Sequence, residues 1–274
     1  MSDAGMMHTV VSKDGTPIAF EQYGVGPPLV LVHGGVCDRT YWAPVLSTLG
    51  QHFTVHTMDR RGRGGSGGSR TAESYAIDQE FADVAAVADA IDEPVHLLGH
   101  SYGGICALDA ALQTGNLRTL VLYEPPLGLE GPAKIPEAFI GRLDTLIAEG
   151  ELDRAVEVMM GELVGLPEEA LAELRTDPAA WQPMVDTVPT LPRELRSVNA
   201  FTFDADRYRA LGVPTVLLAG TLSPPDLHRG VHLVHDAIPD SRVVMMEGVD
   251  HEAVTTGPDV LTATLLDVLG GGAR

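Results

Sequence analysis

Short apolar runs alternate along the chain with segments whose apolar residues recur at helical spacing. A short apolar run bounded by turn residues is typical of a buried strand, whereas recurrence every third or fourth position is typical of a helix. Strands are therefore predicted at residues 28–32, 53–58, 95–98, 117–123, 213–219 and 242–246. Helices are predicted at residues 40–50, 81–91, 105–112 and 258–270. Ahead of them, residues 8–23 predict a two-stranded hairpin that turns at Asp14-Gly15.

The alternation stops at Pro126 and resumes near residue 213. Between these points we find helical patterns only, at residues 139–147, 152–163, 168–174 and around Leu195. Strands that alternate with helices predict an α/β fold, with a mostly parallel central sheet flanked by helices. We expect residues 1–126 and 207–274 to form this core and residues 127–206 to form an inserted all-helical lid. Such a lid would cover the carboxyl ends of the strands, where parallel sheets bind ligands.

The segment from Val95 to Gly104 carries the most specific motif of the chain. It reads Val-His-Leu-Leu-Gly-His-Ser-Tyr-Gly-Gly, so an apolar strand enters a Gly-x-Ser-x-Gly motif and a helical pattern follows. This context predicts a nucleophile elbow, a sharp strand-to-helix turn that holds Ser101 in a strained backbone conformation. A Cβ at Gly99 or Gly103 would collide with the neighbouring strand and helix. Ser101 Oγ would then lie at a helix N-terminus, where backbone N–H groups favour developing negative charge.

Composition narrows the function classes. With 274 residues, 45% hydrophobic and 20% charged, the chain is typical of a globular protein with one large or two small domains. No apolar run reaches the length of a membrane span, and the N-terminus lacks the pattern of a secretory signal. The net charge of −20 argues against nucleic-acid and anionic-membrane partners and favours neutral or cationic substrates. Cys37 and Cys106 are expected to be reduced thiols of a cytoplasmic protein. The oligomeric state is left open, a homodimer included.

Several segments resemble those of the α/β-hydrolase family over nearly the whole chain. Residues 33–35 (His-Gly-Gly), directly after a buried strand, resemble the family's oxyanion segment. Residues 59–66 (Asp-Arg-Arg-Gly-Arg-Gly-Gly-Ser) resemble its Asp-x-Arg-Gly-x-Gly-x-Ser loop, and residues 248–251 (Gly-Val-Asp-His) resemble the loop with its catalytic histidine. The resemblance implies a cofactor-free serine hydrolase whose catalytic groups occur in the order Ser, acid, His.

The chemistry of acyl transfer assigns a role to each group. A serine hydroxyl is a weak nucleophile, so a base must take its proton, and His251 follows the last predicted strand on a loop that could reach Ser101. The resemblance implies that the backbone N–H groups of Val36 and Tyr102 stabilise the oxyanion. His100 is expected to pack beside the elbow.

The acid departs from the family pattern. The family usually carries an aspartate just after the strand predicted at residues 213–219, where this chain has Ser223. Glu124, at the end of the preceding strand, and Asp226 are the two substitutes. We favour Glu124, because a fixed strand end orients a histidine better than a residue that caps a helix. Asp250 is too close in sequence to its neighbour His251 to be a suitable partner.

A glycine pattern and several histidines could suggest cofactor or metal binding, but we expect structural roles for them. The Gly-x-Gly-x-x-Gly pattern at residues 62–67 lacks the helix that a dinucleotide-binding motif opens, so no nucleotide cofactor is predicted. His33 is expected to brace the oxyanion segment. Three histidines share one predicted helical face but lack companion ligands, so we expect a solvated stripe and no metal: His228, His232 and His235. Four residues of the predicted lid fit either a substrate pocket or the lid's own core: Met159, Met160, Trp181 and Met184.

The sequence thus predicts a serine hydrolase that acts on an ester, thioester or lactone of a small, fairly apolar molecule. Ser101 would attack, His251 would relay the proton and Glu124 would orient His251. Epoxide hydrolases and haloalkane dehalogenases need an aspartate nucleophile, so Ser101 argues against both. Two alternatives stay open: a C–C bond hydrolase or a lyase or cyclase of secondary metabolism on the same scaffold, and a ligand-binding receptor with a vestigial triad.

Overall fold

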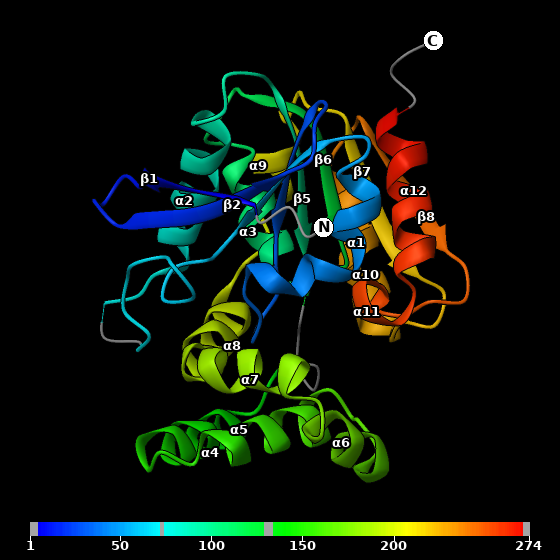
Figure 1. The fold of residues 1–274 in the computed structure, drawn as a ribbon. Helices are drawn as coiled ribbons and strands as arrows, with labels where there is room; N and C mark the ends of the chain where they lie inside the picture. Colours follow the sequence, from blue (N-terminus) through cyan, green and yellow to red (C-terminus); the bar gives the residue numbers. More distant parts are fainter. Residues whose placement is uncertain (1–4, 72–73, 129–133, 271–274) are drawn as a thin grey trace.

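A single eight-stranded sheet organises the computed structural model, which describes residues 5–71, 74–128 and 134–270 (Figure 1). The strand order is β1-β2-β4-β3-β5-β6-β7-β8, and the six strands from β4 to β8 in this order are parallel to one another. The bounds are β1 Met6–Val11, β2 Pro17–Tyr23, β3 Pro28–Val32, β4 Thr54–Met58, β5 Val95–His100, β6 Leu117–Tyr123, β7 Thr215–Gly220 and β8 Ser241–Met246. The predicted α/β fold with a mostly parallel sheet is confirmed.

The antiparallel edge of the sheet is the predicted hairpin. β1 pairs with β2 in a register that joins Val11 to Pro17, and β2 pairs antiparallel with β4. Gly15 adopts a φ of 89° in the turn, a left-handed conformation that glycine reaches without steric cost.

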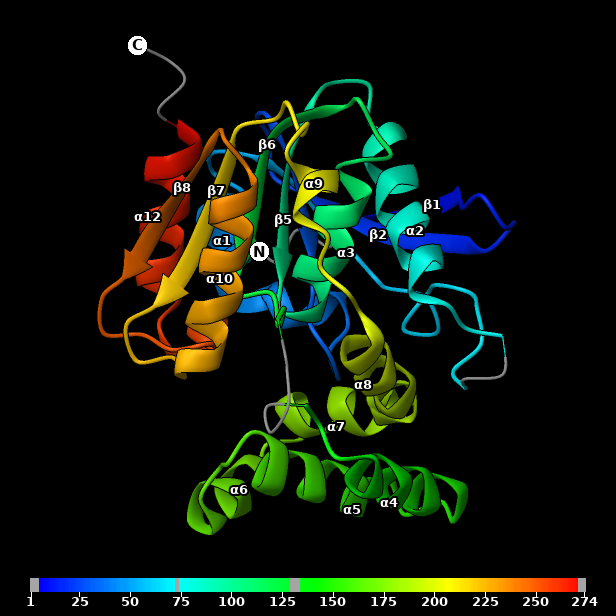
Figure 2. The same ribbon diagram turned by 180° about the vertical axis from the view of Figure 1, so that it is seen from behind.

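Helices cover both faces of the sheet (Figure 2). One face carries α2 Ile77–Asp89, α3 Tyr102–Ala110, α9 Ala205–Tyr208 and α10 Pro225–Ala237. The other carries α1 Ala43–Leu49, preceded by the 3-10 helix η1 Arg39–Trp42, together with α11 Ala253–Thr256 and α12 Pro258–Gly270. No helix of the described residues is long and apolar enough to cross a membrane.

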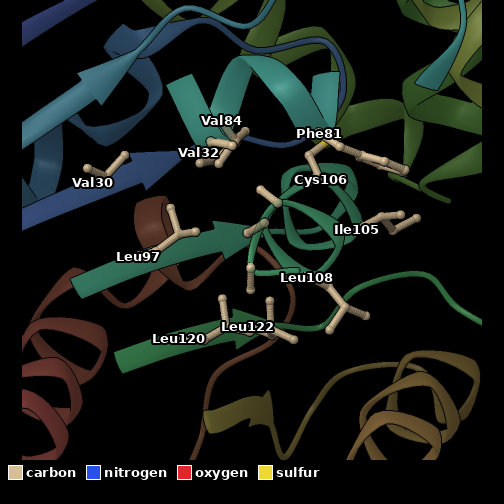
Figure 3. Close-up of a cluster of buried hydrophobic side chains, with 14 of the residues drawn as sticks. Val30, Val32, Phe81, Val84, Leu97, Ile105, Cys106, Leu108, Leu120 and Leu122 are labelled. Carbon is tan, nitrogen blue, oxygen red and sulfur yellow. The ribbon is translucent and has the colours of Figure 1, made fainter. Parts of the chain in front are cut away.

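Alternate residues of the buried strands supply two separate cores, because successive side chains of a strand point to opposite faces. Val30 and Val32 pack with side chains of α2 and α3, as Figure 3 shows. Leu29 and Leu31 belong to the core beneath α1 and α12. All five residues of β3 are buried, which explains why this strand appears in the sequence as one uninterrupted apolar run.

The chain between β6 and β7 builds a third, helical core. Its elements are α4 Glu137–Ala148, α5 Leu152–Val158, the π-helix η3 Met159–Leu163, α6 Glu168–Arg175, α7 Pro178–Thr187, the 3-10 helix η4 Val188–Thr190 and α8 Leu191–Ala200. We call residues 134–200 the helical insert. Met159 and Trp181 are buried in its core, with Met160 and Met184 packed against them. The arrowheads of β7 and β8 point toward the end of the molecule where the insert lies (Figure 2).

Candidate active site

Ser101 occupies a strained turn between β5 and α3. Its φ of 55° and ψ of −123° lie outside the helical and extended regions. The turn is closed by glycines, since a Cβ at Gly99 would lie 2.3 Å from the carbonyl oxygen of Gly103. A Cβ at Gly103 would lie 2.4 Å from the carbonyl oxygens of Val32 and His33. The predicted collisions with helix and strand are therefore present, and the serine side chain is left partly exposed at the end of the sheet.

Three non-glycine residues of the described chain have positive φ angles, and all three are candidate site residues. They are Val36 (53°), Ser101 (55°) and Glu124 (46°). Each follows the carboxyl end of one of three adjacent strands, β3, β5 and β6. Left-handed backbone at a β-branched or bulky residue costs about 1–3 kcal/mol and persists where the surroundings impose it. The strain is thus concentrated where parallel sheets bind ligands.

Glu124 and His251 form a hydrogen-bonded carboxylate–imidazole pair. His251 Nδ1 lies 2.7 Å from Glu124 Oε2, and the backbone N–H of Gly220 donates to Glu124 Oε1 over 2.8 Å. Glu124 is completely buried, whereas 22% of the His251 side chain is exposed. With its proton on Nδ1 and directed at the carboxylate, the imidazole keeps the Nε2 lone pair free to accept a proton.

The other carboxylates considered for this role lie elsewhere. Asp226, in the first turn of α10, is exposed and forms an ion pair with Arg229. Asp250 accepts hydrogen bonds from the N–H of Glu252 (3.0 Å) and the hydroxyl of Thr256 (3.1 Å), within its own loop. Ser223 is buried, and its hydroxyl has no hydrogen-bond partner among the described residues. Of the two substitutes left by the sequence, the geometry places Glu124 against His251.

Comparison with known proteins agrees with this architecture. A model of the Alpha/beta hydrolase family matches residues 29–264. The chain belongs to this family. A crystal structure of an alpha/beta hydrolase from Sphaerobacter thermophilus is 36% identical, covers 96% of this chain and 100% of that chain, and has a TM-score of 0.82. An esterase structure from Rhodococcus sp. is 26% identical, covers 96% and 98%, and has a TM-score of 0.73.

A further relative carries the name of an enzyme activity. N-formylmaleamate deformylase from Pseudomonas putida is 37% identical over 133 residues, which span 46% of this chain and about half (49%) of that protein. Its name and that of the Rhodococcus esterase describe hydrolytic enzymes. The predicted family is confirmed, and the chain is an α/β-hydrolase, a hydrolytic enzyme.

In this α/β-hydrolase two side chains at the ends of β5 and β6 hold the backbone of the loop that carries His251. His100 Nε2 donates to the carbonyl oxygen of His251 over 2.9 Å, and the Tyr123 hydroxyl donates to that of Asp250. The His100 and His251 rings lie 4.6 Å apart between centroids. Burial, together with the adjacent His251, lowers the pKa of His100 well below its ordinary value, so His100 stays neutral and keeps its Nε2 proton for this bond.

Ser101 follows His100 in the chain and the His251 ring lies beside that of His100, but no hydrogen bond joins the serine hydroxyl to the imidazole in this structure. A Cβ at Gly34 would lie 3.1 Å from Ser101 Cβ and 3.4 Å from His100 Nδ1, and the His100 ring lies next to that of His251 with a tilt of 43°. Hydrogen bonds of this kind commonly tighten only when substrate is bound. In the mechanism proposed below, Ser101 Oγ approaches His251 Nε2 when the substrate binds.

The oxyanion segment is held by His33 and by a residue that the sequence did not single out, Arg60. His33 donates from Nδ1 to the carbonyl oxygen of Gly34 (2.9 Å) and accepts at Nε2 from the N–H of Arg60 (3.2 Å). Burial and the nearby arginines lower the pKa of His33, so the neutral ring can make both bonds. Tyr102 begins α3, and the first N–H groups of a helix have no partner within the helix.

The remaining candidate groups form no second catalytic or metal site among the described residues. Burial raises the pKa of the Cys37 and Cys106 thiols, both of which are free, so neither offers a thiolate nucleophile. His228 Nε2 bonds to the carbonyl oxygen of Gly220, and His235 Nδ1 bonds to Ser241 Oγ. Within the described residues no group of three His, Cys, Asp or Glu side chains has metal-binding geometry.

Proposed function

We propose that this α/β-hydrolase cleaves a carboxylic ester, thioester or lactone of a small, fairly apolar molecule through an acyl-enzyme on Ser101. The observation that carries the proposal is the 2.7 Å contact between His251 Nδ1 and Glu124 Oε2 beneath a serine in a strained elbow. A carboxylate at this position fixes the imidazole tautomer that can act as a general base.

The reaction proceeds in two halves. His251 Nε2 takes the Ser101 proton as Oγ bonds to the substrate carbonyl carbon, and the carbonyl oxygen becomes an oxyanion. The N–H groups of Val36 and Tyr102 stabilise this oxyanion. The tetrahedral intermediate collapses, the bond to the leaving group breaks, and His251 gives that group the proton. Water then attacks the acyl-enzyme, its proton passes through His251 to Ser101 Oγ, and the carboxylic acid leaves.

The surroundings of the oxyanion segment support a fairly apolar substrate. The Val36 side chain packs into the core of the helical insert, close to Leu191 and Leu195. Gly35, the residue before it, is partly exposed, and a Cβ there would lie 3.5 Å from Glu194 Oε2 and 3.9 Å from Leu191 Cδ1. An acyl group that reaches the two oxyanion donors would therefore meet apolar side chains of the insert together with one carboxylate, and the insert would act as the lid.

A comparison of two serine variants tests the proposal. Wild-type enzyme should hydrolyse members of an ester panel and gain one fluorophosphonate adduct by mass spectrometry, whereas Ser101→Ala should lose both properties. Ser223→Ala is the matched control, because it removes a buried hydroxyl that has no partner. Full turnover by Ser101→Ala would refute the acyl-enzyme mechanism, and ligand binding without turnover in both proteins would instead support a receptor.

A second candidate reaction is cleavage of an amide such as an N-formyl group. Among the described residues Glu194 Oε2 is buried without a hydrogen-bond partner, and it would lie 3.5 Å from a Cβ at Gly35. An acceptor beside the oxyanion segment matches the N–H group of an amide, which an ester lacks. The N-formylmaleamate deformylase similarity agrees with this chemistry. The ratio of kcat/KM for an ester and the amide of the same acid decides between the two reactions.

A further inference from the structure

A buried ion-pair cluster joins the helical insert to the core beside the oxyanion segment. Arg60 binds Glu80 of α2 with both Nε (2.6 Å) and Nη2 (3.0 Å), and the same Nη2 lies 2.8 Å from Oε1 of Glu194 on α8. Arg63 Nη2 binds the same Glu194 oxygen and the Thr190 hydroxyl (2.6 Å). The side chains of Arg60, Glu80 and Glu194 are at most 1% exposed. Removing a partner from such a cluster leaves a buried charge uncompensated.

The charge of Glu80 is fixed over the ordinary pH range. Burial alone would raise the pKa of Glu80, but the adjacent Arg60 outweighs it and holds the pKa of Glu80 at about 2. The contacts are therefore charge-assisted hydrogen bonds, which are stronger and more directional than neutral ones.

Arg60 touches both segments that carry the proposed oxyanion donors. Its Nη1 donates to the carbonyl oxygen of Gly34 over 2.8 Å, two residues before Val36. Its guanidinium carbon lies 4.3 Å from the centroid of the Tyr102 ring. One buried guanidinium thus links the loop after β3 with the first residue of α3. A shift of Arg60 would change the distance between the two backbone N–H groups.

The insert contacts the same loop at two further points. Val36 is a member of the insert's own hydrophobic core, although it belongs to the loop after β3. Glu194 Oε2 lies against Gly35, at 3.5 Å from the position of a Cβ there. The loop residues from Gly34 to Val36 are therefore held between Arg60 on the core side and α8 on the insert side.

We propose that Glu194 is a positioning residue: through Arg60 it sets the oxyanion hole, so that docking of the insert and the geometry of the two oxyanion donors are coupled. The inference rests on the proposed acyl-enzyme function. Glu194 itself acts on Arg60 and the Gly34–Val36 loop and need not touch the reacting atoms. Because the oxyanion forms only along the reaction path, a misplaced donor lowers kcat more than it changes KM.

The test compares Glu194→Gln with Arg193→Gln in the full chain. Arg193 precedes Glu194 on α8 and also ties the insert to the core, but through the carbonyl oxygens of Ser69 and Arg61 and the Tyr75 ring. Both variants should lower the melting temperature. Glu194→Gln should lower kcat on a simple ester by about 10- to 100-fold, the loss expected of a misplaced reacting group. Its KM should stay close to that of the wild type, and affinity for a boronic acid, which forms a tetrahedral adduct on serine, should fall by the same factor.

Each outcome bears on the inference. A Glu194→Gln enzyme with wild-type kcat and boronate affinity overturns it, and so does an equal loss of kcat in Arg193→Gln, which would show a general effect of insert docking. Should Glu194→Gln fail to fold, Glu194→Asp keeps the charge but shortens the reach to Arg60, and the same selective loss of kcat is expected. Retained activity in Ser101→Ala would instead refute the underlying function.

Discussion

Replacement of Glu124 by glutamine should inactivate the enzyme through the tautomer of His251. The carboxylate accepts two hydrogen bonds, from the Gly220 N–H at Oε1 and from His251 Nδ1 at Oε2. A glutamine has one acceptor oxygen and one NH2 group in the same space. If its NH2 group faced Gly220, two donors would oppose each other and a buried N–H would lose its partner, at a cost of about 1–3 kcal/mol. The amide oxygen is therefore expected to stay with Gly220.

The NH2 group then faces His251 Nδ1, and the imidazole can accept this bond only with its proton on Nε2. That tautomer cannot take the proton of Ser101. Loss of the correct tautomer in a serine–histidine–acid triad lowers kcat by about 10⁴-fold, which corresponds to a barrier higher by about 5.5 kcal/mol. KM should change little, because neither Glu124 nor the ring tautomer contributes to ground-state binding of the acyl group.

The assay is the steady-state hydrolysis of an ester near pH 7.5, with the fluorophosphonate labelling rate as a second readout. Both depend on deprotonation of Ser101, so kcat and the labelling rate should fall together. Asp226→Asn is the matched control, since Asp226 is exposed and bound only to Arg229 among its described ion-pair partners. A Glu124→Gln enzyme within 10-fold of wild type, or a large loss in Asp226→Asn alone, would refute the reasoning.

Three further predictions concern stability. Gly103→Ala should destabilise the fold by about 3 kcal/mol or more, because its Cβ would lie 2.4 Å from two backbone oxygens; a melting temperature close to that of the wild type would contradict this. Gly141→Ala in α4, where no atom lies within 4 Å of the new Cβ, should stabilise the protein by about 1 kcal/mol in urea unfolding, and a loss of stability would contradict the open site. Burial, aided by Arg118, lowers the pKa of His96 from its ordinary value of 6.5 to about 4. Between these values the unfolded chain binds a proton that the native protein does not, so stability falls as the pH drops. His96→Leu should flatten urea-unfolding stability over pH 4.5–6.5 by up to about 1.4 kcal/mol per pH unit, and an unchanged slope would refute the assignment.

Buried strands were predictable nearly to the residue, because burial leaves an apolar run in the sequence. The predicted strand at residues 28–32 coincides with β3, which is buried throughout, and the one at 117–123 coincides with β6, whose last four residues are buried. The helix α7 was not predicted, since it carries two prolines that argue against a helix in sequence. Pro178 stands in its first turn, where no N–H is needed, and Pro183 lies within it. Packing of Trp181 and Val185 in the insert's core compensates for the lost hydrogen bond.

In the candidate site, too, the residue set by a local motif was easier to predict than the one set by contacts between distant segments. Ser101 stands in a motif whose glycines are imposed by contacts within a few residues or with the adjacent strand, and such a requirement is visible in sequence. The choice between Glu124 and Asp226 depended on which strand end approaches the loop after β8. The sequence favoured Glu124 through a general argument about rigidity and through the use of this strand end for the acid in some members of the family that it resembles. The positive φ of Glu124 and the N–H of Gly220 that orients its carboxylate became apparent only in the structure.

The Arg60–Glu194 contact had no sequence signal at all, and the reason is physical. Its partners are 134 positions apart, and each stands in a segment where a charged residue is ordinarily solvated. What makes the pair favourable is that Glu80, Gly34 and Tyr102 surround the same guanidinium and replace the water it loses. Of the four partners of the Arg60 guanidinium, Glu194 alone belongs to the insert. The core therefore supplies most of its hydrogen bonds and its charge partner Glu80 before the insert docks. Glu194 therefore adds little to the solvation of Arg60 and acts mainly on its direction, which is why we expect its loss to lower kcat through Arg60. The lower melting temperature expected of the same variant has another source, the buried Arg63, which also pairs with Glu194.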